Sequence, residues 1–83
     1  MKKIILLLQA QEELDKIYDP LFSDIIQRIE CLRDYPEWGH TMAGQFFGYR
    51  TCIVGLFRIV YKILPNEDIE IAYIRHCRRD LKI

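Results

Sequence analysis

The sequence predicts an α+β domain, with an N-terminal strand and a two-helix hairpin packed on a twisted antiparallel sheet of three to four strands. Two observations lead to this fold class. Apolar residues recur at helical spacing in the first half of the chain, and they alternate with polar residues in the second half. A length of 83 residues with 51% apolar side chains indicates one globular domain, so residues 1–83 are assigned to a single unit.

The first predicted element is a strand, formed by the apolar run from Ile4 to Leu8 behind two lysines. This run is shorter than a membrane span, and no small-residue cleavage site follows it. We therefore expect neither a targeting signal nor a membrane role. Ala10, Leu14 and Ile17 then recur at helical spacing and predict the first helix.

The second predicted helix covers roughly residues 20–34. Asp19 and Pro20 mark its start, because Asp is a good N-cap and Pro is pre-set for the first helical position. Pro36 and Gly39 end it. Its apolar stripe consists of Phe22, Ile25, Ile26, Ile29 and Leu32.

Three strands are predicted in the second half of the chain. Residues 49–54 and 56–63 are rich in aromatic and β-branched side chains and flank Gly55, which predicts a tight hairpin. A turn over 65–68 leads to a further strand at 69–75. In the middle strand, apolar residues alternate with Arg58 and Lys62, so we expect one face to pack on the helices and the other to carry cations.

The formal net charge of zero is a cancellation between two halves. Residues 1–44 hold five basic and eight acidic side chains, a net charge of −3, whereas residues 45–83 hold seven basic and four acidic ones, a net charge of +3. The sheet is therefore expected to carry a cationic surface. Exposed strands also carry Arg and Lys for solubility and edge protection, and that explanation stays open.

The cysteine pattern indicates a reduced, cytoplasmic protein. Cys31, Cys52 and Cys77 are an odd number and contain no CxxC pair, which is neither a disulfide framework nor a zinc ribbon. We expect semi-buried free thiols.

Several segments share their order and spacing with one known family. The helical half contributes Ala10-x-x-x-Leu14-x-x-Ile17 and Leu32-x-x-x-Pro36-x-x-Gly39, and the strand half contributes Gly48-Tyr49-Arg50, the run from Val54 to Tyr61 and the run from Ile74 to Asp80. On these segments the chain resembles the RelE/ParE toxin superfamily over nearly its whole length.

The resemblance implies the toxin of a bacterial type II toxin–antitoxin system, a class that includes plasmid stabilization proteins. It implies a cognate antitoxin as partner, no membrane and no small-molecule cofactor. RelE-like members cut mRNA in the ribosome, and ParE-like members inhibit DNA gyrase. We favour a ribosome-dependent mRNA endonuclease. The alternatives are a gyrase inhibitor, which the ending from His76 to Asp80 and the pI of 6.7 favour, and an inactive member that only binds an antitoxin.

RelE-type cleavage needs a base, a general acid and cations around the pentavalent phosphate, and it needs no metal. The resemblance implies Arg58, Arg50 and His76 as catalytic residues. Arg58 would stabilise the phosphate and His76, with a pKa near neutrality, would transfer a proton. Cys52 stands where RelE-like enzymes often have a second Lys. A His76 that merely stacks on the sheet remains an equal alternative.

A second set of cations is implied to bind phosphate or RNA. It consists of Lys62, Arg75, Arg78 and Arg79. Arg78 and Arg79 are a pair near the end of the sequence, and a solvated arginine pair is the alternative for them. Tyr61 resembles the structural tyrosine of the family, whereas Tyr73 matches none of its catalytic positions, and we expect it in the core or at its rim.

Overall fold

The computed structural model describes residues 2–78 and confirms the α+β class. Its elements, in chain order, are β1 (Ile4–Leu6), α1 (Leu8–Leu14), α2 (Leu21–Asp34), β2 (His40–Thr41), the 3₁₀ turn η1 (Gly44–Phe46), β3 (Arg50–Val54), β4 (Phe57–Ile63) and β5 (Ile69–His76). Within this part of the chain, no helix is long and apolar enough to cross a membrane.

The sheet has five strands in the order β1-β5-β4-β3-β2, which is more than the three to four antiparallel strands expected. Two features account for the difference. β1 pairs with β5 in parallel, through Ile4 and Ile69, so the sheet is mixed. β2 consists of only His40 and Thr41, a segment too short to show an alternating pattern in the sequence.

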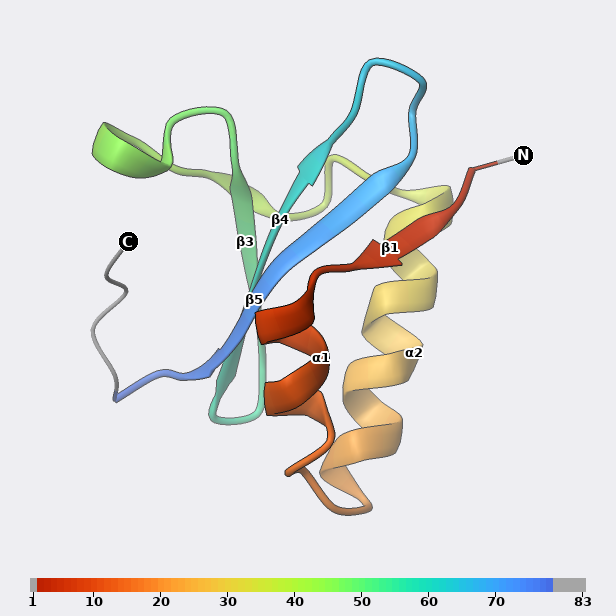
Figure 1. The fold of residues 1–83 in the computed structure, drawn as a ribbon, viewed down its shortest axis with the longest axis vertical. Helices are drawn as coiled ribbons and strands as arrows, with labels where there is room; N and C mark the ends of the chain where they lie inside the picture. Colours follow the sequence, from red (N-terminus) through yellow and green to blue (C-terminus); the bar gives the residue numbers. More distant parts are fainter. Residues whose placement is uncertain (1, 79–83) are drawn as a thin grey trace.

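The helices lie together on one side of the sheet, and the η1 turn lies on the other side (Figure 1). α2 covers fourteen residues, as predicted within one residue. Asp19 supports its start, because Oδ1 of Asp19 accepts hydrogen bonds from the backbone N–H of Ser23 at 3.1 Å and from its hydroxyl at 2.6 Å. α1 is shorter than predicted, since it ends at Leu14, but Ile17 beyond it is still buried.

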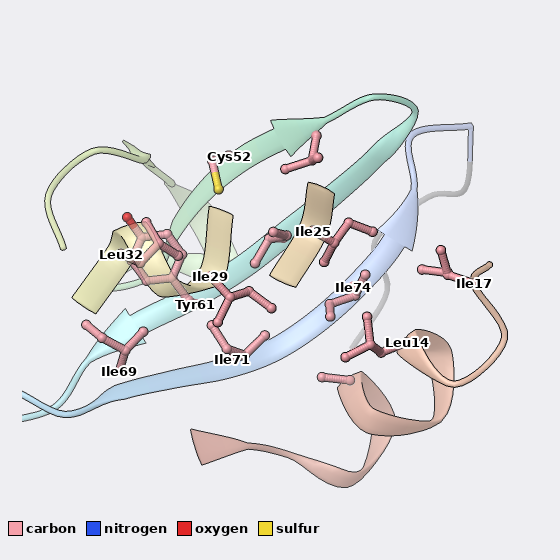
Figure 2. Packing of buried hydrophobic residues seen from close by; sticks show 13 residues of the cluster. Leu14, Ile17, Ile25, Ile29, Leu32, Cys52, Tyr61, Ile69, Ile71 and Ile74 are labelled. Carbon is pink, nitrogen blue, oxygen red and sulfur yellow. The ribbon is translucent and has the colours of Figure 1, made fainter. Parts of the chain in front are cut away.

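One apolar core fills the space between the helices and the sheet (Figure 2). The predicted stripes supply it, and side chains from the helices and from the strands point toward one another there. Its buried members are Ala10, Leu14, Ile17, Ile25, Ile29, Leu32, Cys52, Val54, Ile59, Tyr61, Ile69, Ile71 and Ile74. The strand residues of this set define the helix-facing side of the sheet.

The β3–β4 hairpin has the tight turn that the sequence predicts. Gly55 takes a positive φ of +59° and, with Leu56, forms the two-residue connection between the strands. Gly at the first central position with φ > 0 is the signature of a type II′ turn. The turn fixes the register, so that Ile53 lies opposite Arg58 and Thr51 lies opposite Val60.

The β4–β5 pairing contains one irregularity. Val60 pairs with Tyr73, but the next residue, Tyr61, pairs with Ile71, which leaves Ala72 as an extra residue on β5. Such a bulge changes the side toward which the following residues point. Because of it, Arg75 lies opposite Arg58.

Tyr61 connects the centre of the sheet to the loop that follows α2. Its side chain is fully buried, and its hydroxyl donates to the carbonyl of Pro36 at 2.7 Å and accepts from the N–H of Gly39 at 2.9 Å. A Cβ atom at Gly39 would lie 2.6 Å from this hydroxyl and 2.9 Å from the carbonyl of Thr51, so only glycine fits there.

Candidate nucleic-acid interface

The side of the sheet opposite the helices carries three of the predicted cations, and we call it the open face. Successive strand residues point to opposite sides. Because core residues such as Cys52, Ile59 and Ile74 lie on the helix-facing side, the residues next to core residues along each strand belong to the open face. These neighbours are Thr51 and Ile53 of β3, Arg58, Val60 and Lys62 of β4, and Glu70, Tyr73 and Arg75 of β5.

Arg58 and Arg75 are direct partners across the β4–β5 ladder of the open face. Side chains at such positions have Cβ atoms about 4.5–5.5 Å apart, and like charges there destabilise the sheet. Within residues 2–78, neither guanidinium has a hydrogen-bond or ion-pair partner. The pair therefore forms a concentrated positive charge that an anion would stabilise.

Lys62 lies further along β4 and is partly neutralised. Its Nζ is 3.8 Å from a carboxylate oxygen of Glu70 and 5.3 Å from the centre of the Tyr49 ring. The open face thus combines cations with aromatic rings. Arg75 adds to this pattern, because its guanidinium carbon lies 5.2 Å from the centre of the Tyr73 ring.

Arg50 does not share a surface with Arg58. It pairs with Tyr61 in the ladder and so lies on the helix-facing side. Its Nη1 donates to the carbonyl of Gly39 at 3.0 Å and to that of Glu37 at 3.3 Å. Arg50 thereby holds the same loop that Tyr61 holds, and its guanidinium is occupied in the structure.

His76 also lies on the helix-facing side, as the ladder partner of Phe57. The two rings meet edge to face with centroids 5.4 Å apart. Nδ1 of His76 accepts a hydrogen bond from the backbone N–H of Arg78 at 3.1 Å, so the proton of the neutral ring resides on Nε2. Arg78 itself is exposed, and Arg79 lies outside the described residues.

The structure therefore brings together three of the predicted cations, Arg58, Lys62 and Arg75, and separates Arg50 and His76 from them. The register explains the separation. A two-residue turn pairs Ile53 with Arg58, and every second residue from Ile53 then shares the face of Arg58. The turn residues Gly55 and Leu56 were the sequence signal for this arrangement.

Three aromatic residues at the open face were not predicted as site residues. Phe46 of η1 meets the ring of Tyr49 edge to face, with a centroid distance of 6.3 Å, and meets Tyr73 in the same way at 6.3 Å. Tyr73 is half-buried and lies next to the arginine pair. Tyr49 and Tyr73 are among the side chains of this face that can carry a transferable proton, together with Lys62, Glu70 and His40, the ladder partner of Thr51.

Cys52 belongs to the core rather than to the open face. Burial raises the pKa of its thiol, and the charge of Arg28 and a hydrogen bond from it oppose that shift in part. All three cysteines are free. Across residues 2–78, no group of three or more His, Cys, Asp or Glu side chains is arranged to hold a metal ion.

Comparison with family models gives one match. Residues 4–81 match the model described as "ParE toxin of type II toxin-antitoxin system, parDE". No curated protein matches the sequence.

Solved structures from toxin–antitoxin systems share this fold. The RelBE2 complex of Mycobacterium tuberculosis matches with a TM-score of 0.81 at 17% identity, covering 90% of this chain and 96% of that chain. The intact RelBE complex of E. coli matches with a TM-score of 0.79 at 10% identity, covering 95% and 100%. The chromosomal ParDE system of P. aeruginosa matches with a TM-score of 0.72 at 20% identity, covering 92% and 96%. At sequence identities this low, the structural similarity shows that the fold is shared.

Proposed function

The chain belongs to the ParE toxin family of type II toxin–antitoxin systems, and on that premise we propose that it arrests translation by cleaving messenger RNA on the ribosome. The observation that carries this proposal is the pairing of Arg58 with Arg75 on the open face. Two adjacent guanidinium groups without a carboxylate partner destabilise the sheet. Phosphate groups are the anions that such a pair binds best.

In this proposal the 2′-hydroxyl loses its proton and attacks the adjacent phosphate, the 5′-oxygen of the next nucleotide leaves and takes up a proton, and Arg58 and Arg75 stabilise the charge that develops on the phosphate. Lys62 binds a neighbouring phosphate, and Arg78 extends the cationic surface at the end of β5. Tyr73 lies beside the pair and carries a hydroxyl, so it is the candidate for proton transfer. His76 and Arg50 act indirectly by holding the backbone at the two ends of the site.

A second candidate function is inhibition of DNA gyrase without cleavage of nucleic acid. The observation in its favour is that the imidazole of His76 lies on the side of the sheet opposite Arg58. Cleavage demands proton transfer at the phosphate, and His76 is then not placed to supply it at Arg58. Binding to gyrase makes no such demand.

Under either proposed function, the expected partner of this chain is a cognate antitoxin. The RelBE and ParDE systems with this fold contain antitoxins. We propose that this chain likewise has an antitoxin, acidic where it meets the open face and partly disordered before it binds. A small neighbouring gene that encodes a DNA-binding N-terminal segment would support the pair.

The proposal is tested by expressing the chain from a tightly controlled promoter and mapping the 5′ ends of cellular mRNA by primer extension. We expect growth arrest together with new ends at defined codons. Arg58→Ala and Arg75→Ala should each reduce the number of new ends about a hundredfold, because each removes a donor to the charged transition state.

Arg33→Ala is the matched control, since Arg33 is an exposed arginine on α2, in the helical layer. This variant should arrest growth like the original chain. Growth arrest without new mRNA ends, accompanied by blocked supercoiling, would establish the gyrase alternative. No arrest in the absence of antitoxin would identify an inactive member of the family.

A further inference from the structure

The segment of residues 42–49 folds back over the open face and inserts one side chain into it. Phe46 is only 7% exposed, although its neighbour Phe47 is 84% exposed. The ring of Phe46 sits between Tyr49 and Tyr73, each at a centroid distance of 6.3 Å and nearly perpendicular to it. Phe46 therefore occupies an aromatic site next to the arginine pair.

Val60 and Thr51 are neighbours of the two tyrosines on the open face, because Val60 pairs with Tyr73 and Thr51 follows Tyr49 by two residues along the chain. They are ladder partners on the open face, and the helices lie on the opposite side of the sheet (Figure 1). Val60 is nevertheless fully buried, and the Oγ1 atom of Thr51 is buried without a hydrogen-bond partner among the described residues. We attribute this burial to the segment that carries Phe46.

The hydroxyl of Thr51 is a polar group next to the two tyrosines that Phe46 cannot satisfy. A buried hydroxyl without a hydrogen bond is unfavourable and uncommon in folded proteins. A phenyl ring fills the space between two tyrosine rings but has no polar edge to offer to Thr51. A flat ring with hydrogen-bonding groups on its rim would satisfy both, and a nucleobase is such a ring.

The segment is also built so that it can move away from the sheet. Gly44 and Gly48 flank Phe46 with φ values of +66° and +93°, and both have open space around them. Its backbone hydrogen bonds close on the segment itself, from Phe47 N–H to Gly44 and from Tyr49 N–H to Phe46, and within residues 2–78 none reaches β4 or β5. The contact between the rings of Phe46 and Tyr73 holds the segment on the open face.

We propose that Phe46 is a plug in a nucleobase site, and that a base of single-stranded RNA displaces it, packs between Tyr49 and Tyr73 and hydrogen-bonds to Thr51. This inference rests on the proposed function, because the phosphate next to that base would reach Arg58 and Arg75. The free toxin is then autoinhibited, since its own side chain competes with the RNA for the site. A base in the place of Phe46 would meet both tyrosine rings edge to face, a contact that any base can make, so the site would contribute affinity rather than codon choice.

The experiment measures binding of a short, fluorophore-labelled single-stranded RNA to the purified full chain by fluorescence anisotropy. Phe46→Ala vacates the site and should tighten binding about tenfold, because it removes the competition from the closed form. Phe47→Ala, the matched control, should stay within about twofold of the original chain, because Phe47 already points into solvent. Adding Thr51→Val to Phe46→Ala should reverse most of the gain.

Unchanged or weaker binding by a Phe46→Ala variant that keeps its circular dichroism spectrum overturns the plug, and so does a complete absence of binding. A second measurement avoids substitution at the site. The four phenylalanines are replaced by 4-fluorophenylalanine, and the fluorine resonance of Phe46, assigned with Phe46→Leu, should move toward its position in the unfolded chain when the RNA is added.

A resonance that stays in place while RNA binds overturns the proposal, as does one that moves with an antitoxin-derived aromatic peptide but not with RNA. Failure of the proposed function is seen separately. New mRNA ends in cells combined with a stationary Phe46 would reject the plug alone, whereas the absence of new ends from the original chain would reject mRNA cleavage itself.

Discussion

The side chain that most constrains the architecture around the site is Tyr61. Its hydroxyl bridges the carbonyl of Pro36 and the N–H of Gly39, two backbone groups of a loop that has no regular structure. Burial raises the pKa of Tyr61, with the Gly39 N–H opposing the shift, so the hydroxyl stays protonated at neutral pH and can donate. The structural role expected for this tyrosine is confirmed.

Replacing Tyr61 with Phe should destabilise the protein by about 1–3 kcal/mol, because two backbone groups lose their partner in a buried place. The measurement is the free energy of unfolding from urea titration followed by circular dichroism. Tyr73→Phe is the control. The Tyr73 hydroxyl has no hydrogen bond within the described chain, and its loss should change stability by less than about 0.5 kcal/mol. Equal effects of the two substitutions would contradict the bridging role of Tyr61.

At the level of secondary-structure elements, the start of α2 is the clearest case of a local signal that the fold preserved. The sequence pairs Asp19 with Pro20, and the carboxylate of Asp19 indeed receives the N–H and the hydroxyl of Ser23. The helix begins at Leu21, one residue later than predicted, so Pro20 rather than Asp19 occupies the N-cap position, where no side-chain cap hydrogen bond forms. Both bonds satisfy donors in the first turn, and the negative charge also suits the positive end of the helix dipole.

Asp19→Ala should therefore lower stability by about 1 kcal/mol, which corresponds to a drop in melting temperature of about 4–8 °C for a domain of this size. The melting temperature is measured by thermal unfolding. Asp34 is an exposed aspartate in the last turn of the same helix, where a negative charge is unfavourable. Asp34→Ala should leave the melting temperature unchanged or raise it slightly. A drop of the same size in both variants would indicate a general effect of lost charge rather than capping.

The bulge at Ala72 is the element-level feature that assembles the candidate site. Without it, the register near the β4–β5 turn would continue and place Ile74 opposite Arg58. The extra residue moves Arg75 into that position and Tyr73 opposite Val60. A single residue thus decides whether the last strand presents an isoleucine or an arginine beside Arg58.

For the whole molecule, the separation of charge seen in the sequence becomes a separation in space. The acidic first half supplies the helices, and three cations of the basic second half, Arg58, Lys62 and Arg75, lie on the opposite side of the sheet. The formal net charge of zero therefore does not describe the surface that a polyanion would meet. Association with RNA depends on this local charge.

Binding of single-stranded RNA should weaken with salt in proportion to the number of phosphates contacted. Three contacts predict a slope of about −2 in a plot of log affinity against log salt concentration, since each contact contributes about −0.7. Arg58→Gln should reduce the slope by about 0.7, whereas Arg33→Gln, on the helical side, should leave it unchanged. Equal slopes for these two variants would show that RNA does not bind at the open face.

The sequence alone determined most of the secondary structure through local spacing and turn propensity, and its motifs determined the family. The apolar stripe of α2, the Asp19–Pro20 boundary, the Gly55 turn and the alternation in β4 each predicted the element that formed, because spacing and turn propensity act over a few residues. The motifs along the chain also identified the family. β2 escaped prediction, since two residues carry no periodicity.

Only the tertiary structure decided which of the predicted residues share a surface. Arg50 and His76 match family motifs, yet strand register turns both toward the helices, and Arg50 is occupied by two loop carbonyls. Register and the bulge also brought Tyr73 to the arginine pair, and the η1 turn brought Phe46 to Tyr73. The physical reason is that a strand alternates sides at every residue, so a shift of one position, set by distant pairing, exchanges the two faces.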